Sequence, residues 1–154
     1  MVNMKKSEKL SSSLEDYLET IHHIEAEKKA ARVKDIAGRL SVRSASVTGA
    51  LRALSKRGLV NYSPYDIVTL TPEGETVARK IVRRHSALNN FFRNVLCVED
   101  KVAEDCACRM EHMVSDGVLE RFVSLAELLE SGPCGAVVWD AKKHSFVFRS
   151  RKGL

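Results

Sequence analysis

The sequence predicts a mainly α-helical fold in which a winged helix-turn-helix domain is followed by an all-α domain. Two observations support this class. Apolar residues recur with a helical period through most of the chain, whereas β-type runs are short and few. The two clearest β-type runs, at 59–62 and 67–70, directly follow a pair of helical patterns, which is the order of elements in a winged helix-turn-helix.

The predicted elements divide the chain into four segments. We expect a flexible leader at 1–12, a winged helix-turn-helix domain at 13–74, a linker helix with a helical domain at 75–131, and a short tail at 132–154. The patterns predict helices at 13–27, 33–40, 44–57, 72–95, 98–115 and 118–131, with short strands at 59–62 and 67–70. Residues 136–139 and 145–148 are typical of either a terminal hairpin or a loosely ordered tail.

The first helix is predicted from a cap and an apolar stripe. Ser13 can cap a helix in which Asp16 takes the third helical position. Apolar residues then recur with helical spacing, namely Leu14, Tyr17, Leu18, Ile21 and Ile24.

Turn and cap residues set the limits of the next elements. The dipeptide Ser41-Val42 separates two helices that each have an apolar stripe, and Gly58 closes the second of them. The segment 63–66, which contains a proline, forms the turn between the two strands. Thr71 followed by Pro72 is the signature of a cap and a first helical position, so the long helix begins there. A break at 132–135 ends the last helix.

Composition excludes several classes of protein. With 44% hydrophobic and 29% charged residues, eight Gly and three Pro, the chain is typical of a globular protein rather than a collagen-like or low-complexity one. No apolar stretch approaches the roughly 18 to 20 residues of a membrane helix, and no signal segment is visible, so we expect a cytoplasmic protein without a membrane partner. The four cysteines are then better explained as thiols, some of them metal ligands, than as disulfides.

Charge is distributed unevenly along the chain. Residues 28–57 contain nine basic residues and one acidic residue, whereas residues 98–130 contain nine acidic and three basic residues. The first segment suits a polyanion and the second suits cations. Two solvated helical surfaces of opposite charge would explain the same pattern. Charge alone therefore does not establish a function, and the sequence motifs are needed to choose between the two explanations.

The helix-turn-helix carries a candidate DNA-binding surface. In this fold the second helix of the pair enters the major groove, and short hydroxyl side chains and long basic ones suit base edges and phosphates. Arg43 and Arg52 are nine residues apart, so they cannot both contact one base pair, and Arg52 is better suited to a phosphate. The predicted DNA-binding residues are Lys34, Arg43, Ser44, Ser46, Thr48 and Arg52. A helix-turn-helix also occurs in proteins that never contact nucleic acid.

A second group of residues has metal-ligand chemistry. Cys108, Glu111 and His112 have the i, i+3, i+4 spacing that places a thiolate, a carboxylate and an imidazole on one face of a helix. A buried cysteine beside a surface ion pair is the alternative explanation. Asp16 and Glu19 form an i, i+3 carboxylate pair, which is also typical of compensation of a helix dipole.

Together, these motifs resemble the diphtheria toxin repressor and manganese transport repressor family of metal-dependent transcription factors. The resemblance covers residues 13 to about 131 and rests on the segment 13–21, the helix-turn-helix, Arg84-His85, and the segment 108–116. It implies a homodimer with a winged DNA-binding domain and a helical dimerisation domain, with the metal at the junction of the domains. Many iron-type relatives add an SH3-like domain at the C-terminus, and we expect none here because about 20 residues follow Gly132.

The resemblance also assigns residues to the metal. Asp16 and Glu19 match the manganese-type carboxylate positions, whereas Cys108 stands where the manganese branch has Glu and follows the iron branch. Oxygen ligands favour Mn²⁺ and a thiolate favours Fe²⁺ or Zn²⁺, so the cofactor is expected to be Mn²⁺, Zn²⁺ or Fe²⁺. The implied metal ligands are Asp16, Glu19, His85, Cys108, Glu111 and His112. Asn89 stands where relatives have an acidic ligand of a second site, and Glu104 could replace part of that site.

The function that follows is metal-activated repression of metal-uptake genes by a homodimer bound to double-stranded operator DNA. The cation would neutralise facing carboxylates and order the dimer for operator binding. The second half of the chain has more apolar residues than two small domains of a monomer would bury, and these residues predict the dimer interface. They are Leu88, Phe91, Phe92, Val95, Val118, Leu119, Phe122, Val123, Leu125 and Leu128.

Three alternatives come from other classes. A zinc-stabilised interaction module could use Cys106, Cys108, His112 and Cys134, in which case metal removal would unfold the chain. A metal-independent winged-helix regulator would have acidic helices that are only a solvated surface. An enzyme would need Cys108 and His112 as nucleophile and base, yet no oxyanion loop or orienting partner is visible, so we expect no enzymatic activity.

Overall fold

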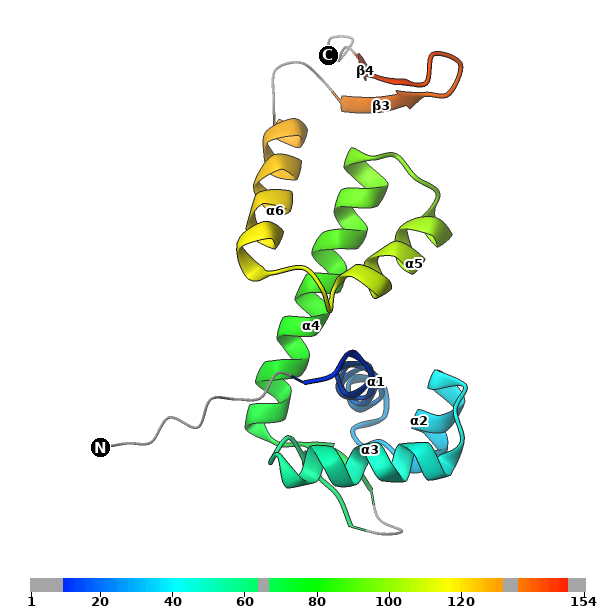
Figure 1. The fold of residues 1–154 in the computed structure, drawn as a ribbon, viewed down its shortest axis with the longest axis vertical. Coiled ribbons are helices and arrows are strands. Elements are labelled where there is room, and N and C mark those ends of the chain that lie inside the picture. Colours follow the sequence, from blue (N-terminus) through cyan, green and yellow to red (C-terminus); the bar gives the residue numbers. More distant parts are fainter. Residues whose placement is uncertain (1–9, 64–66, 132–135, 150–154) are drawn as a thin grey trace, which may run out of the picture. The chain divides into compact units, whose positions relative to one another are not determined.

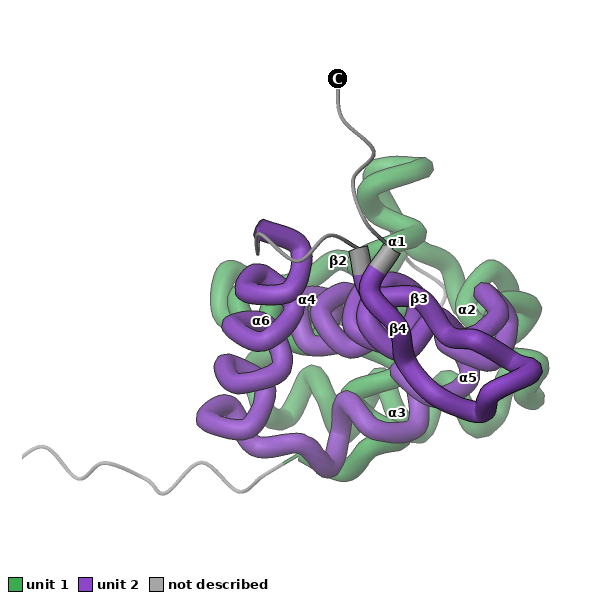
Figure 2. Tube along the Cα trace, turned by 90° about the horizontal axis from the view of Figure 1, so that it is seen from above, with its two compact units in different colours: residues 1–81 green, residues 82–154 purple. Residues whose placement is uncertain are grey.

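The computed structural model describes residues 10–63, 67–131 and 136–149 and divides into two compact units, residues 1–81 and 82–154 (Figures 1 and 2). Most of the described residues are helical, which confirms the predicted mainly α fold class. No helix among the described residues is long and apolar enough to cross a membrane. The predicted leader lies largely outside the described residues, as do the wing turn at 64–66 and the break at 132–135.

The first unit contains the predicted helix-turn-helix and its hairpin. Its elements are α1 (Ser12–Lys28), α2 (Val33–Leu40), α3 (Ser44–Lys56), β1 (Val60–Asn61), β2 (Thr69–Leu70) and the first half of α4 (Pro72–Asn90) (Figure 1). The three helices bury one apolar face each against the strands, and the centre of this core contains Leu18, Ile21, Ile36, Leu51, Leu54 and Val68. The helical period of the sequence therefore identified the elements that pack together.

The start of α1 differs from the prediction. The N-cap is Ser11 rather than Ser13, and the Ser11 side chain accepts a hydrogen bond from the Leu14 amide at 3.4 Å. Three consecutive serines offer equivalent caps, so the cap itself does not fix the start. Leu10 packs against the core of the first unit, which places the adjacent Ser11 at the cap position.

The turn and the wing follow the sequence signals. Ser41 and Gly58 both have a left-handed backbone, with φ of 54° and 71°. The wing, defined here as β1 and β2, pairs antiparallel with Val60 opposite Leu70, in strands shorter than predicted. Thr71 caps α4 by accepting a hydrogen bond from the Gly74 amide at 3.0 Å, as predicted.

The second unit contains the rest of the helices and a terminal hairpin. Its elements after α4 are the π-helical turn η1 (Phe91–Val95), α5 (Asp100–Met110), α6 (Asp116–Ser131), β3 (Ala136–Asp140) and β4 (Ser145–Arg149) (Figure 1). Leu88, Phe91 and Ala107 are among the buried residues of its core. The rings of Phe91 and Phe122 meet edge to face, with centroids 4.7 Å apart.

Two predicted helices have different limits in the structure. The helix predicted to reach residue 95 changes to a π-helical turn at Phe91, because the apolar residues there turn into the core of the second unit. The helix predicted at 98–115 ends at Met110, Glu111 is its C-cap, and residues 111–113 form a turn. The three donors expected on one helical face therefore do not share one helix.

The hairpin resolves the ambiguity about the end of the chain. Residues 136–140 and 145–149 pair antiparallel, with Trp139 opposite Phe146 and their rings 4.9 Å apart. The strand β3 contacts η1 and α6. The hairpin is thus part of the second unit, and nothing in residues 136–149 has an SH3-like topology.

Candidate metal centre and nucleic-acid interface

His85 on α4 lies between two carboxylates of the second unit. Its Nδ1 is 2.7 Å from Glu111 Oε2, and its Nε2 is 3.0 Å from Glu104 Oε1. The hydrogen bond to Glu111 raises the pKa of His85 to about 9, against the opposing effect of burial and with a further contribution from Glu104. Both ring nitrogens therefore donate, and the imidazolium is fixed in orientation.

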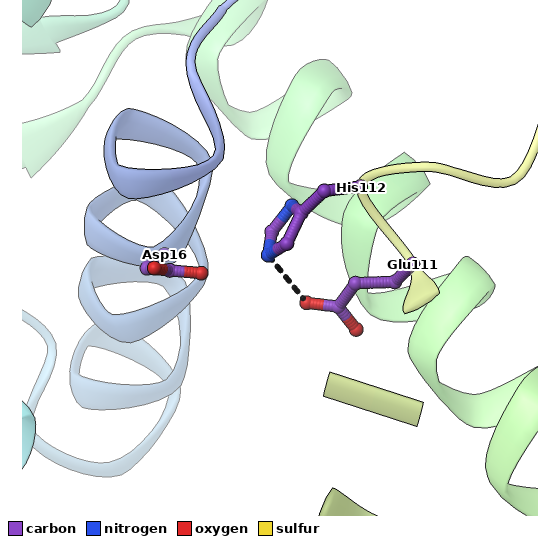
Figure 3. Close-up of side chains that lie close together, drawn as sticks. All are labelled: Asp16, Glu111 and His112. Atoms are coloured by element: carbon purple, nitrogen blue, oxygen red, sulfur yellow. Dashed lines mark ion pairs between the residues drawn. The ribbon is translucent and has the colours of Figure 1, made fainter. Parts of the chain in front are cut away.

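Glu111, one of the two carboxylates beside His85, is buried and only partly hydrogen-bonded. It is 1% exposed, and its Oε1 has no hydrogen-bond partner. His112 Nε2 lies 3.4 Å from that oxygen, close enough for an ion pair although the geometry is not that of a hydrogen bond (Figure 3). A buried carboxylate oxygen without a donor is costly, so it favours a cation. This observation shows that the residues of the second unit fit a metal ion.

Glu104 and Asn89 complete the surroundings of His85. The Asn89 side-chain amide donates to the Glu104 carboxylate, whose other oxygen faces His85. Asn89 Oδ1 is buried and has no hydrogen-bond partner. The structure therefore brings Asn89 and Glu104, the two residues that the sequence associated with an incomplete second site, together beside His85. Hydrogen bonds hold the three side chains in place.

Cys108 is placed differently from the other predicted ligands of the second unit. It is exposed on α5, and within the described residues it belongs to no group of three donors whose ligand atoms lie within 4.8 Å of one another. Glu111 keeps a helical backbone as the C-cap of α5, whereas His112 lies in the turn that follows, so the three donors do not lie on one continuous helical face. Its assignment as a ligand stays a prediction.

The two predicted ligands of the first unit lie on α1. Asp16 and Glu19 are half-buried and three residues apart, so they share one face of the helix. Glu19 Oε1 also lies 3.7 Å from His23 Nε2. Neighbouring positions on this helix, Glu15 and Thr20, are buried. The carboxylates are therefore in a partly desolvated environment, which strengthens their attraction to a cation.

The predicted DNA-binding residues lie on α2, at the start of α3 and along α3. Lys34, Arg43, Ser44, Ser46 and Arg52 are exposed, as a surface that contacts phosphates requires. Thr48 is half-buried, and its hydroxyl donates to the Ser44 carbonyl oxygen at 3.0 Å. This internal bond occupies the donor of Thr48 and was not visible in the sequence, because it depends on the rotamer.

Most residues of the predicted dimer interface lie inside the second unit. Five of them are buried in a single chain, namely Leu88, Phe91, Phe92, Val95 and Leu119. Phe122 is half-buried, and its ring packs against that of Phe91. Val123 is also half-buried. The apolar side chains that remain open on α6 are Val118, Leu125 and Leu128, which are 45%, 44% and 65% exposed. A helical period cannot separate residues that pack within a unit from those that pack between copies.

The thiols give no support to a structural zinc cluster. Cys106 and Cys108 are exposed, and neither joins a close donor group in the part of the chain that the structure describes. Cys134, the fourth predicted member of that cluster, lies outside the described residues.

Sequence reasoning missed the hydrogen bond from the Leu70 amide in the wing to the Glu25 side chain. The two residues are 45 positions apart in the sequence, so no local pattern connects them.

Comparison with known proteins covers both units. Residues 9–68 match the family model described as iron dependent repressor, N-terminal DNA binding domain, and residues 71–140 match the model described as iron dependent repressor, metal binding and dimerisation domain.

The chain is also similar to several transcriptional regulators. It is 37% identical over 121 residues to the HTH-type regulator MntR of Lysinibacillus sphaericus, covering 79% of this chain and 86% of that protein. It is 36% identical over 113 residues to an HTH-type transcriptional regulator of Methanocaldococcus jannaschii, covering 73% of this chain and 90% of that protein. Neither relative is described as an enzyme.

Solved structures show the same fold. The structure of the manganese regulator SloR matches with a TM-score of 0.67 and 27% identity, over 80% of this chain and 58% of that one. A manganese-dependent transcriptional repressor in complex with manganese matches with a TM-score of 0.67 and 28% identity, over 88% of this chain and 62% of that one. The chain thus spans less than two thirds of these longer proteins. By the two family models and by its relatives, the chain belongs to the iron-dependent repressor family, which includes the diphtheria toxin and manganese transport repressors that its motifs resemble.

Proposed function

We propose that this protein is a metal-activated, sequence-specific DNA-binding repressor that controls genes for metal-ion uptake and acts as a homodimer on operator DNA. Family membership supports the class of function. The observation that carries the metal requirement is the buried Glu111 oxygen without a hydrogen-bond partner, beside His85 and His112. A regulator of this kind acts on DNA, and hence in the cytoplasm.

The proposed ligands come from both units of the chain. From the first unit they are Asp16 and Glu19, and from the second they are His85, Cys108, Glu111 and His112. When bound, a divalent cation supplies the positive charge that this group of carboxylates lacks. Ligands drawn from two units would hold those units in one relative arrangement, and that arrangement would raise operator affinity by favouring the competent conformation.

The chain's own residues prepare the site before any metal is present. Glu104 and Glu111 orient the His85 ring from opposite sides, and Asn89 in turn holds Glu104. A histidine ring that carboxylates already hold in one orientation loses little side-chain entropy when it binds a metal ion. The proton held between His85 and Glu111 has to leave when the ring becomes a ligand, so metal binding is coupled to proton release.

Metal identity follows from the ligand types. Carboxylates favour Mn²⁺, while the imidazoles and the thiolate of Cys108 favour Fe²⁺ or Zn²⁺. We further propose that, within the family, the chain is most similar to the treponemal transport-operon repressor, on the motifs at 13–21 and 108–116. A titration of operator binding with Mn²⁺, Fe²⁺ and Zn²⁺ distinguishes the candidates.

The decisive experiment compares two neutralised carboxylates. Glu111→Gln replaces the buried oxygen with a neutral amide of the same shape, and Glu127→Gln does the same at an exposed position of α6. We expect Glu111→Gln to remove metal-stimulated operator binding, measured by fluorescence anisotropy, and Glu127→Gln to leave it intact. Equal stimulation in both variants would contradict the proposed site.

Circular dichroism with a chelator separates the alternatives. A chain that stays folded but loses operator binding supports the metal sensor. Unfolding by the chelator would instead support a structural metal site, and unchanged operator binding would support a metal-independent regulator. In the same assay, Asp16→Ala combined with Cys108→Ala should leave a folded dimer whose operator binding no longer responds to metal.

A further inference from the structure

A side chain of α1 completes the hydrogen bonding of the wing. The Leu70 amide donates to both carboxylate oxygens of Glu25, at 3.2 and 3.3 Å. Glu25 lies near the end of α1, on the same helix as Asp16 and Glu19. The wing strand β2 is therefore held by the helix that carries two of the proposed metal ligands.

The geometry of β2 explains why Leu70 needs this partner. Asn61 pairs with Thr69, and the Thr71 amide donates to the Leu59 carbonyl oxygen at 3.1 Å, so alternate residues of this strand face β1. Leu70 lies between them, and its amide points to the opposite edge of β2. Within the part of the chain that the structure describes, no strand runs along that edge beside Leu70, and an amide without a partner there would be costly if it were buried.

The opposite edge of β2 is formed by the chain that follows α1. Ala31 and Val68 exchange two backbone hydrogen bonds, at 3.0 and 2.8 Å. In an antiparallel ladder the next pair would join Lys29 to Leu70. Lys29 instead has a left-handed backbone and donates to the Glu25 carbonyl oxygen as the C-cap of α1. The Glu25 carboxylate thus takes the position that a third strand would have occupied.

A second side-chain link joins α1 to the start of α4. His22 Nδ1 is 3.1 Å from Glu75 Oε2, and the other oxygen of Glu75 accepts from Arg79 at 2.7 Å. Next to this link, Gly74 lies so close to Leu59 that an added Cβ would be 1.8 Å from the Leu59 carbonyl oxygen. The base of the wing is therefore tightly packed, and Glu25 provides the side-chain hydrogen bonds from α1 to the wing strand β2 itself.

We propose that Glu25 is a positioning residue that couples α1 to the wing, so that metal binding on α1 changes the position of the wing on DNA. The inference rests on the proposed function, because it assigns to Asp16 and Glu19 the role of ligands on the same helix. Partial burial of the Glu25 carboxyl, which raises its pKa, agrees with a contact that is partly shielded from water.

The test uses three variants of the full chain. Glu25→Ala removes the acceptor, Glu25→Gln keeps an oxygen that can accept from the Leu70 amide, and Glu27→Ala is the matched control. Glu27 is an exposed residue of the same helix and pairs with Arg39 at 2.8 Å, so its removal changes the charge equally without affecting the wing.

Two measurements are made on each variant. Hydrogen exchange of the Leu70 amide, followed by NMR, reports the contact itself. The ratio of operator affinity with saturating Mn²⁺ to that with a chelator reports the coupling. We expect Glu25→Ala to speed Leu70 exchange and to reduce the ratio by roughly five- to tenfold, and the other two variants to retain both wild-type values. Mn²⁺ affinity without DNA should be unchanged in all three.

The outcomes separate this proposal from the proposed function. If the wild-type chain shows no response of operator binding to metal, the proposed function fails, whereas Leu70 exchange still tests the contact. If Glu25→Ala leaves the exchange or the ratio unchanged, the coupling is overturned. If Glu25→Ala does not fold, Glu25→Asp, which keeps the charge but is one methylene shorter, replaces it with the same expected results. A ratio that falls equally in Glu25→Gln would also overturn the role of the hydrogen bond.

Discussion

His85 orients two carboxylates of the proposed metal site. Its protonated ring supplies a positive charge between Glu104 and Glu111, and hydrogen bonds fix both of its nitrogens. This arrangement stabilises the carboxylates in the absence of metal. Because the pKa of about 9 lies above the ordinary value of 6.5, the stabilisation is complete below pH 6.5 and is lost as the pH rises through 9.

This leads to a prediction about metal affinity. If His85 has to lose its proton to become a ligand, the apparent affinity for Mn²⁺ should rise by about tenfold per pH unit between neutral pH and about 9. An anaerobic titration followed by electron paramagnetic resonance measures this slope. In His85→Gln the slope should flatten, while His144→Gln, in the exposed turn of the terminal hairpin, should keep it. An unchanged slope in His85→Gln would show that another group releases the proton.

At the scale of elements, the sequence predicted the helices well and their ends less well. The stripes of α2 and α3 identified both helices, Gly58 follows the end of α3, and Thr71 caps the start of α4 as predicted. The cap of α1 was misplaced by two residues because Ser11, Ser12 and Ser13 are chemically equivalent. The end of α5 at Met110 was missed since the apolar period continues into residues that form turns.

The candidate site could be predicted only in part, for a related reason. Ligand types and spacing pointed to Glu111 and His112, and the resemblance pointed to His85. The burial of Glu111 and the lack of a hydrogen-bond partner for its Oε1 depend on packing between helices that are far apart in the sequence. The contact of Glu25 with the Leu70 amide likewise depends on where β2 lies relative to α1, which no local pattern encodes.

Helix α3, the second helix of the helix-turn-helix, gives a prediction at this scale. Arg52 is exposed, and a long basic side chain in this position is expected to contact a phosphate rather than a base. Arg52→Ala should therefore weaken binding to operator and to unrelated DNA alike. It should also reduce the slope of log K against log salt concentration by about 1.

The salt slope is measured with metal bound throughout, and Arg121→Ala is the control. Arg121 is also exposed but lies on α6, in the second unit. Loss of affinity for the operator alone, with the slope intact, would instead assign Arg52 to base recognition.

At the scale of the whole molecule, the two units differ in charge and in surface. The segment 28–57, with nine basic residues, belongs to the unit that matches the DNA-binding domain of the family, and the acidic segment 98–130 belongs to the unit that matches the metal-binding and dimerisation domain. A formal net charge of +5 therefore hides a separation of functions. The basic segment increases the encounter rate with DNA, and the acidic segment attracts divalent cations.

The open apolar residues of α6 lead to a prediction of where a second copy binds. Leu125 and Leu128 are exposed in the single chain, whereas the other apolar residues predicted for the interface mostly fill the core of the second unit. A double variant, Leu125→Lys with Leu128→Lys, should therefore weaken the dimer at least about tenfold without unfolding the chain, because exposed positions change stability by only about 0.5 kcal/mol. Sedimentation equilibrium measures the dimer, and thermal unfolding measures stability.

Two controls show whether this surface is the interface. Val102→Lys introduces the same charge at a residue of α5 that is 46% exposed, close to the 44% of Leu125, and should leave the dimer intact. Leu119→Ala removes a buried side chain and should lower stability by about 2–5 kcal/mol, since Leu119 belongs to the core of a single unit. A dimer that tolerates both lysines on α6 but dissociates with Val102→Lys would move the interface to α5. Because operator sites for dimers have two halves, a monomeric variant should also lose operator affinity while it still binds metal.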